Sequence, residues 1–157
     1  MIGTRNEMSL HASLKEHYRR EGDLVEGKIG NYVIDLVQED RLVEIQTGNF
    51  SALKTKLAQL LKNHAVHVVY PIAQERHLVY VHAKTRDVIR KRKSPKKGQI
   101  YDLFSELIRI PHLIRNSNLS LEAVLIREEE IRCDDGQGSW RRRGISILDR
   151  RLVQIVE

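Results

Sequence analysis

The sequence predicts an α/β domain followed by an α+β extension, and three observations support this fold class. Two early segments carry apolar residues at helical spacing. Short apolar runs typical of strands lie between and after these segments. A strongly basic stretch then separates this first part from a second group of helix and strand patterns. The expected order is helix, three strands, helix and strand, then a basic linker and the extension.

The first part of the chain accounts for the α/β pattern. Residues 8–20 are expected to be helical, because Leu10, Leu14 and Tyr18 recur at a spacing of four. A second apolar stripe predicts the other helix, and its members are Phe50, Leu53, Leu57, Leu60 and Leu61. Strands are expected at residues 23–29, 32–37, 42–47, 65–72 and 76–83. The fourth of these is almost continuously apolar, which is typical of a buried strand with a parallel neighbour.

The composition of the chain changes after residue 84. Residues 86–98 carry seven basic residues, one acid, a proline and a glycine, which is typical of a loop or linker. A helix is expected at 99–110, followed by a long hairpin that turns at residues 135–138 and a last short strand. We therefore divide the chain into a core (1–84), a basic loop or linker (85–98) and an α+β extension (99–157) packed on the core.

Charge and composition narrow the class of protein. The 157 residues are 41% hydrophobic and 31% charged, as in soluble globular proteins. The N-terminal residues lack the apolar stretch of a secretory signal, and no run is long enough to span a membrane. The only cysteine is Cys133, which excludes a disulfide framework and a thiolate zinc site. We expect a cytoplasmic protein, and its net charge of +6 favours a polyanionic partner.

Two carboxylates stand out on the expected hairpin at residues 32–47. If the hairpin turns at Glu39 and Asp40, Asp35 lies directly opposite Glu44, with their Cβ atoms about 5 Å apart. The opposite face of the hairpin is expected to be core, and it holds Tyr32, Ile34, Leu36, Val43 and Ile45. Opposed like charges repel, so we expect either a protonated carboxyl group or a cation between the two groups.

A divalent metal ion is one such cation. The carboxylates of Asp35 and Glu44 and the carbonyl of Ile45 would form an all-oxygen site, which suits Mg²⁺ or Mn²⁺. Gln46 would lie beside this site on the same face. The alternative is that both acids face solvent and pair with basic neighbours. A shift of the register by one residue would place the two acids on opposite faces and remove the site.

This pattern resembles the PD-(D/E)xK nuclease superfamily. The resemblance covers residues 7–72, where the expected order of helices and strands matches the restriction-endonuclease-like core, αβββαβ, with a central mixed sheet flanked by helices. Asp35 matches the acid of the second strand, and Glu44-Ile45-Gln46 matches the motif of the third strand. The resemblance implies Mg²⁺-dependent hydrolysis of phosphodiester bonds. The chain also resembles an uncharacterised prokaryotic family with "EIQTGNFSALKxKL" and "GSWRRRG" segments.

The chain departs from the superfamily at the motif lysine. Gln46 occupies that position, and its amide can orient a water molecule but carries no charge. Some members of the superfamily take the lysine from the following helix, where Lys54 is the first candidate and Lys56 the second. The superfamily often has a further acid on the first helix, for which Glu7 and Glu16 are candidates.

Two basic segments are expected to contact nucleic acid through phosphates and stacked bases. The residues expected to make these contacts are Arg90, Lys91, Arg92, Lys93, Lys96, Lys97, Trp140 and Arg141. Two alternatives stay open. Residues 86–98 can be a solvated loop, and arginines 141–143 can pair across the last hairpin with acids 128–130, so that Glu130 faces Arg143.

The function that best fits these observations is metal-dependent hydrolysis of DNA. Asp35 and Glu44 would bind the metal ion, Gln46 would position the water and Lys54 would contact the phosphate. The first alternative is a catalytically inactive nucleic-acid-binding module on the same fold. The second is a protein-interaction domain whose basic surface meets an acidic partner. A homodimer stays open in each case.

Overall fold

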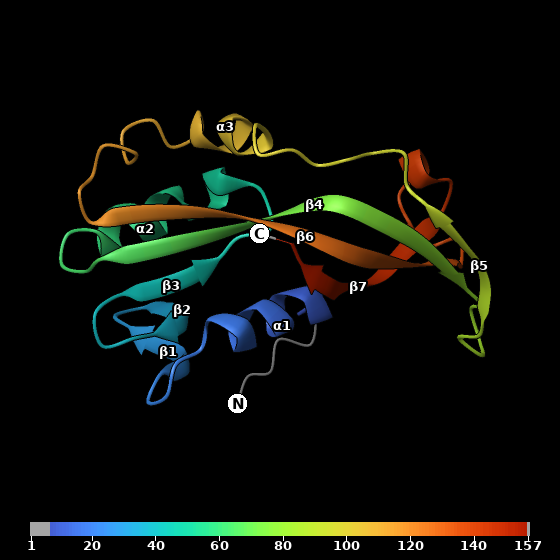
Figure 1. Cartoon of the computed structure of the whole chain (residues 1–157), viewed down its shortest axis with the longest axis horizontal. Coiled ribbons are helices and arrows are strands. Elements are labelled where there is room, and N and C mark those ends of the chain that lie inside the picture. Colours follow the sequence, from blue (N-terminus) through green and yellow to red (C-terminus); the bar gives the residue numbers. More distant parts are fainter. Residues whose placement is uncertain (1–6, 157) are drawn as a thin grey trace. The chain divides into compact units, whose positions relative to one another are not determined.

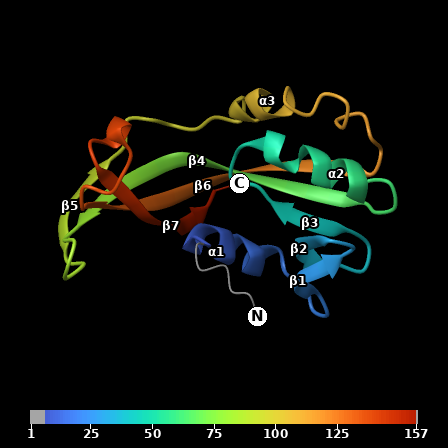
Figure 2. The same cartoon turned by 180° about the vertical axis from the view of Figure 1, so that it is seen from behind.

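The structure is a computed structural model that describes residues 7–156, and it has a mixed α/β fold (Figures 1 and 2). The chain forms two compact units. The first, which we call the meander unit, comprises Leu14–Ile72 and Gln99–Val124. The second, the hairpin unit, comprises residues 7–13, Ala73–Gly98 and residues 125–156. These boundaries differ from the three consecutive segments expected from composition. None of the described helices is long and apolar enough to cross a membrane.

Three antiparallel strands begin the meander unit. They are β1 (Leu24–Ile29), β2 (Tyr32–Val37) and β3 (Leu42–Ile45). A 3₁₀ turn, η1 (Phe50–Leu53), and helix α2 (Lys54–Leu60) then lead to β4 (Val66–Val81), which pairs in parallel with β3. The beginning of β6 (Leu119–Asp134) lies next to β4, so the strand order of this unit is β1-β2-β3-β4-β6. The sheet is therefore mixed, as expected.

The core of the meander unit lies between the sheet and α2. The predicted stripe on α2 and η1 is confirmed, because Phe50, Leu53, Leu57, Leu60 and Leu61 are all buried. Phe50 packs edge to face on Tyr70, with 5.4 Å between the ring centroids. Helix α3 (Asp102–Leu107) packs Leu103 and Leu107 on the same core. Its Glu106 accepts a hydrogen bond from the Phe50 N–H at 2.8 Å.

Strand β4 is longer than the sequence indicated. Two strands were expected, at residues 65–72 and 76–83, but one strand of 16 residues continues into the hairpin unit. The residues between the two predicted strands, Ala73, Gln74 and Glu75, include no glycine, asparagine or aspartate that favours a turn. The chain therefore stays extended. Strand β6, a long orange arrow in Figure 1, also has 16 residues, and its residues belong to both units.

The hairpin unit contains two antiparallel pairs. Strand β5 (Val88–Lys93) pairs with β4, and β7 (Ile145–Ile155) pairs with β6, which gives the order β5-β4-β6-β7. The expectation of a loop or linker at 85–98 is therefore wrong for residues 88–93. All six residues of β5 are exposed, and an edge strand tolerates such basic residues because its outer side faces solvent.

The predicted hairpin of β6 and β7 is confirmed, but its turn and register differ from expectation. The connection spans residues 135–144 and includes the 3₁₀ turn η2 (Trp140–Arg142). It is closed by a hydrogen bond from Gly138 N–H to the Gly144 carbonyl at 3.0 Å. Because the connection is this long, Glu130 pairs with Arg150, and the expected pairing of Glu130 with Arg143 is wrong.

Helix α1 (Ser9–Tyr18) contributes residues to both units. Within the hairpin unit, the carboxylate of Asp149 accepts hydrogen bonds from the backbone N–H and the hydroxyl of Ser9, at 2.8 and 2.6 Å. The first of these bonds satisfies a backbone N–H group that a helix leaves without an intrahelical partner at its N-terminus.

Candidate functional site

The register of β2 and β3 places the two predicted carboxylates opposite one another. The adjacent pairs are Leu36 with Val43 and Val37 with Leu42, as the sequence predicted. At the next position the carboxylates themselves bridge the strands. Glu44 Oε1 accepts a hydrogen bond from the Asp35 N–H at 3.2 Å, and Asp35 Oδ2 accepts one from the Ile45 N–H at 2.8 Å. Each carboxylate is thus held by the backbone of the opposite strand.

A lysine from α2 supplies a cation to this acid pair. The Lys56 ammonium lies 2.9 Å from Glu44 Oε1 and donates a hydrogen bond to the Val33 carbonyl at 2.7 Å. Lys54, the first candidate from the sequence, is exposed. Two residues apart on an α-helix point about 200° apart, so only one of the two lysines faces the sheet. The structure brings the second candidate, Lys56, to the acid pair.

Burial sets the electrostatics of Glu44. All four residues of β3 are buried, and Glu44 is only 5% exposed. The sequence had assigned the core to the opposite face of the hairpin alone. Burial raises the pKa of the Glu44 carboxyl group, and the nearby Asp35 charge raises it further. The charge of Lys56 acts in the opposite direction.

A third acid, Glu26, lies on the strand next to that of Asp35, and the sequence reasoning missed it. Glu26 lies on β1 between residues that pair with Leu36 and Ile34, which places it opposite Asp35. Its backbone has a φ of 52°, and its carboxylate lies 3.1 Å from the Lys15 ammonium. The turn at Gly30 and Asn31 already implied this position, because it fixes the register of β1 and β2.

The three acids do not form a ready-made metal cluster. Among residues 7–156, no group of three or more histidine, cysteine, aspartate or glutamate residues has the arrangement of a metal site. Glu26 is engaged by Lys15 of α1, and Glu44 is engaged by Lys56 of α2. The oxygen donors of the acid pair are those of Asp35 and Glu44, with the Ile45 carbonyl beside them.

The other residues predicted for this site have contacts of their own. The Gln46 amide donates hydrogen bonds to the carbonyls of Gly48 and Asn49, at 2.5 and 3.3 Å, which holds it on its own loop. Glu16 is exposed and lies 3.5 Å from the Arg19 guanidinium. Glu7, the other predicted acid, contacts His11 in the hairpin unit.

The predicted nucleic-acid-binding residues lie in the hairpin unit. Arg90, Lys91, Arg92 and Lys93 belong to β5, and Lys96 and Lys97 follow it as exposed residues. Trp140 begins η2 and is 82% exposed, with the Arg141 guanidinium 5.6 Å from the centre of its ring.

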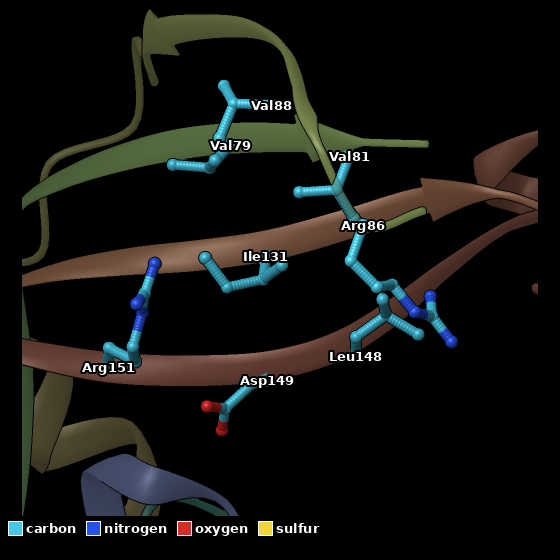
Figure 3. Close-up of a pocket in the computed structure, with 8 residues that line it drawn as sticks. All are labelled: Val79, Val81, Arg86, Val88, Ile131, Leu148, Asp149 and Arg151. Atoms are coloured by element: carbon cyan, nitrogen blue, oxygen red, sulfur yellow. The ribbon is translucent and has the colours of Figure 1, made fainter. Parts of the chain in front are cut away.

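A groove of about 430 Å³ also lies in the hairpin unit (Figure 3). Its apolar part is formed by the buried side chains of Val79, Val81 and Ile131, together with Val88 and Leu148. Figure 3 shows the side chains of Arg86 and Arg151 on either side of Ile131. None of the residues predicted from the sequence as site residues lines this groove.

Comparison with known proteins places the chain in a family. A family model described as "Domain of unknown function (DUF8091)" matches residues 8–157. The chain belongs to the DUF8091 family. It is 34% identical over 157 residues to an "Uncharacterized protein" of Treponema pallidum (strain Nichols), a match that covers 98% of the chain and 61% of that relative. The chain thus spans about three fifths of the relative's length. No solved structure matches the chain.

Proposed function

We propose that the chain is a metal-dependent nuclease with a restriction-endonuclease-like core, which hydrolyses phosphodiester bonds of DNA. The observation that supports this most strongly is the meeting of Asp35, Glu44 and Lys56 from β2, β3 and α2. This set provides the two acids and the basic residue of the PD-(D/E)xK pattern. The order α1-β1-β2-β3-α2-β4, with β4 parallel to β3, agrees with the αβββαβ core.

The possible ligands at the acid pair are oxygen atoms, which are the ligands that a hard divalent cation prefers. The N–H and the carbonyl of a strand residue point to the same edge, so the Ile45 carbonyl faces β2, as its N–H does. Both hydrogen bonds that Glu44 accepts from described residues end on Oε1. Asp35, Glu44 and the Ile45 carbonyl would hold Mg²⁺ or Mn²⁺, which would supply a more acidic water and shield the phosphate charge.

Lys56 provides the positive charge that Gln46 does not. The Gln46 amide nitrogen is directed to its own loop, whereas the Lys56 ammonium lies at the acid pair. A lysine side chain is flexible and carries three donors, so it can hold Glu44 and also bind a phosphate oxygen or orient a water molecule. We therefore assign to Lys56 the role that the motif lysine has in the PD-(D/E)xK superfamily.

The ion pair of Lys56 and Glu44 also favours a second function, a nucleic-acid-binding module without catalysis. Opposed carboxylates are stabilised by a nearby cation or by protonation of one of them. The Lys56 ammonium already supplies such a cation without a metal ion. In this case the ion pair has a structural role, and the basic residues of the hairpin unit bind the nucleic acid.

Cleavage assays with two lysine variants distinguish these functions. Plasmid, single-stranded and branched DNA, with an RNA control, are incubated with the protein in Mg²⁺, Mn²⁺ or EDTA. We expect cleavage only with metal ions, and we expect Lys56→Ala to reduce the rate by about 100-fold or more. Lys54→Ala removes the same charge from the exposed side of the same helix, and its rate should stay within about twofold of the wild type.

Two results would contradict the nuclease proposal. One is wild-type protein that binds any of these nucleic acids yet cleaves none of them with either metal ion. The other is an equal loss of rate in Lys56→Ala and Lys54→Ala, because a charge acting at the acid pair must come from the lysine that reaches it.

A further inference from the structure

Strand β5 directs its arginines and its lysines to opposite faces of the sheet. Arg90 pairs with Tyr80 of β4, and Lys93 pairs with His77. Because side chains alternate along a strand, Arg90 and Arg92 share the face of Tyr80, while Lys91 and Lys93 share the face of His77. The basic run of the sequence is therefore two different surfaces.

The two lysines are already matched by acids of the hairpin unit. The Lys93 ammonium lies 3.3 Å from Glu75, and the Lys91 ammonium lies 3.8 Å from Glu129. The hydrogen bond from Lys93 lowers the pKa of the Glu75 carboxyl group, so the acid is charged at neutral pH. The groove of Figure 3 lies on this face, because Val79 and Ile131 alternate with Tyr80 and Glu130.

The two arginines surround an aromatic ring instead. The Arg90 guanidinium lies 4.4 Å from the centre of the Tyr80 ring, and Arg92 donates a hydrogen bond to the Tyr80 hydroxyl at 3.5 Å. Burial acts to raise the pKa of Tyr80, but Arg92 and Arg132 outweigh it and lower the pKa. Among the described residues, neither Arg90 nor Arg92 has a carboxylate within ion-pair distance. Their charges are thus available to a partner.

Two buried acids hold further arginines on the same face. Glu128 and Glu130 are 2% and 1% exposed. Arg76 donates a hydrogen bond to the Glu128 carboxylate at 2.5 Å, and Arg132 donates one to the Glu130 carboxylate at 2.7 Å. Arg150 lies 3.5 Å from Glu130. Hydrogen bonds to the buried carboxylates hold the guanidinium groups of Arg76 and Arg132, so these two arginines are ordered before any ligand arrives.

The charges on this face do not balance. Five arginines, Arg76, Arg90, Arg92, Arg132 and Arg150, share the face with the buried carboxylates of Glu128 and Glu130, and alternation along β6 adds the exposed Asp134. The surplus is two positive charges on the face that carries the Tyr80 ring. Arginine is suited to phosphate because its planar group donates two parallel hydrogen bonds, and it also stacks on aromatic rings and bases. A surface of this composition fits a ligand that carries both phosphates and flat rings.

We propose that this face of the hairpin unit, the Tyr80 surface (Arg76, Tyr80, Arg90, Arg92, Arg132 and Arg150), binds single-stranded nucleic acid. Phosphate groups of the ligand would contact the arginines. A base would stack on the pair formed by the Arg90 guanidinium and the Tyr80 ring. A single strand is required because the stacking of base pairs in a duplex covers the faces of the bases. The choice of nucleic acid among polyanions rests on the proposed function.

The test compares two double variants with the same change in net charge. Arg90→Gln/Arg92→Gln removes the two charges at Tyr80, and Lys91→Gln/Lys93→Gln removes two charges from the opposite face. Fluorescence anisotropy of a labelled 12-nucleotide DNA strand is measured in EDTA with the full chain. We expect the arginine variant to bind about tenfold or more weakly and to lower the log–log salt slope by about 1.4, or about 0.7 per lost phosphate contact. The lysine variant should lose about threefold or less.

A third variant tests the aromatic ring. Tyr80→Leu keeps an apolar side chain and all the arginines, so a loss of affinity in this variant supports stacking. The fold of each variant is checked by circular dichroism, and exposed residues on an edge strand are substituted in both double variants.

Several results would overturn the proposal. Equal losses in the two double variants would show attraction by overall charge alone. Tighter binding of a duplex of the same sequence would exclude a single-strand surface. Equal competition by polyglutamate would identify an acidic protein as the partner. Because binding is measured in EDTA, an arginine-dependent signal without cleavage in Mg²⁺ would refute only the nuclease proposal. Cleavage without arginine dependence would refute only the Tyr80 surface.

Discussion

At the scale of single residues, Glu44 determines the character of the acid pair. A buried carboxylate is costly unless it is paired and hydrogen-bonded. Glu44 meets this requirement with two groups from different elements, the Asp35 N–H on β2 and the Lys56 ammonium on α2. Burial and the neighbouring acid still raise its pKa. Glu44 is therefore a position at which the fold gives up stability, as functional sites often do.

The raised pKa of Glu44 predicts a pH-dependent stability difference. From pH 4.5, the ordinary value, up to the raised pKa, folded Glu44 keeps a proton that unfolded Glu44 has lost. This group therefore destabilises the fold progressively as the pH rises through that window. Glu44→Gln cannot lose a proton, and Lys56 keeps its bond to Val33. We expect the free energy of unfolding of Glu44→Gln, relative to the wild type, to increase with pH.

Urea unfolding between pH 4 and 8 measures this difference. The control is Glu39→Gln, which removes one acid at an exposed position of the neighbouring turn. A difference that decreases with pH, or that is the same for both variants, would show that burial and Asp35 do not govern Glu44.

The sequence predicted the acid pair because a short turn fixes the register of a hairpin. It ranked Lys54 ahead of Lys56, whereas the structure brings Lys56 to the acid pair. Both lysines lie off the apolar stripe, and the phase of α2 against the sheet depends on the tertiary packing. The turn that fixed Asp35 against Glu44 has a counterpart between β1 and β2. Applying the same reasoning there would have found Glu26.

At the scale of secondary structure elements, β6 shows how a run of three acids is accommodated in one strand. Glu128 and Glu130 face one side and are buried among arginines, while Glu129 faces the other side between Lys91 and Arg151. The alternation of the strand thus divides one acidic run between a buried network and a more open pair of contacts.

This division predicts very different costs for neighbouring substitutions. Glu130 is 1% exposed, and Arg76, Arg132 and Arg150 converge on it. Glu130→Ala leaves buried arginine charge without its partner, so we expect the free energy of unfolding to fall by about 3–5 kcal/mol. Glu129→Ala breaks longer contacts of 3.8 Å and should cost about 1 kcal/mol or less. Chemical denaturation of both variants tests this, and similar costs would contradict the role of Glu130.

Sequence patterns failed for β5 and for the β6–β7 turn, and each failure has a physical cause. The charge of residues 88–93 suggested a linker, but long basic side chains are compatible with an edge strand that has solvent on both sides. For the turn, the glycines at 136 and 138 suggested a tight loop. Arg143, at a φ of 53°, and Gly144, at 79°, extend the connection instead and shift every partner of the acidic run.

At the scale of the whole molecule, the acid pair and the basic Tyr80 surface belong to different units. The acid pair and Lys56 belong to the meander unit, and the Tyr80 surface belongs to the hairpin unit. The net charge of +6 is therefore a poor description of either site. The two sites share no residue, so hydrolysis and binding can be tested by independent substitutions.

Stabilisation of the whole chain by a metal ion is the most direct consequence of the proposed site. A ligand that binds only the folded state adds about 2.7 kcal/mol at 100 times its Kd. For a chain of this length, that corresponds to an increase of roughly 5–11 °C in Tm. We expect Mn²⁺ or Mg²⁺ to raise the Tm of the wild type relative to EDTA. Asp35→Asn should abolish the increase, because an amide is a weak ligand for a hard cation.

The same variant separates loss of the metal ion from loss of the fold. The Asn side chain keeps an oxygen that accepts the hydrogen bond of the Ile45 N–H, and its neutrality relieves the repulsion with Glu44. In EDTA, Asp35→Asn should therefore be at least as stable as the wild type. Asp40→Asn, which changes an exposed acid paired with Arg20, should keep the metal-dependent increase. An equal increase in all three proteins would show metal binding elsewhere and would exclude the acid pair as the site.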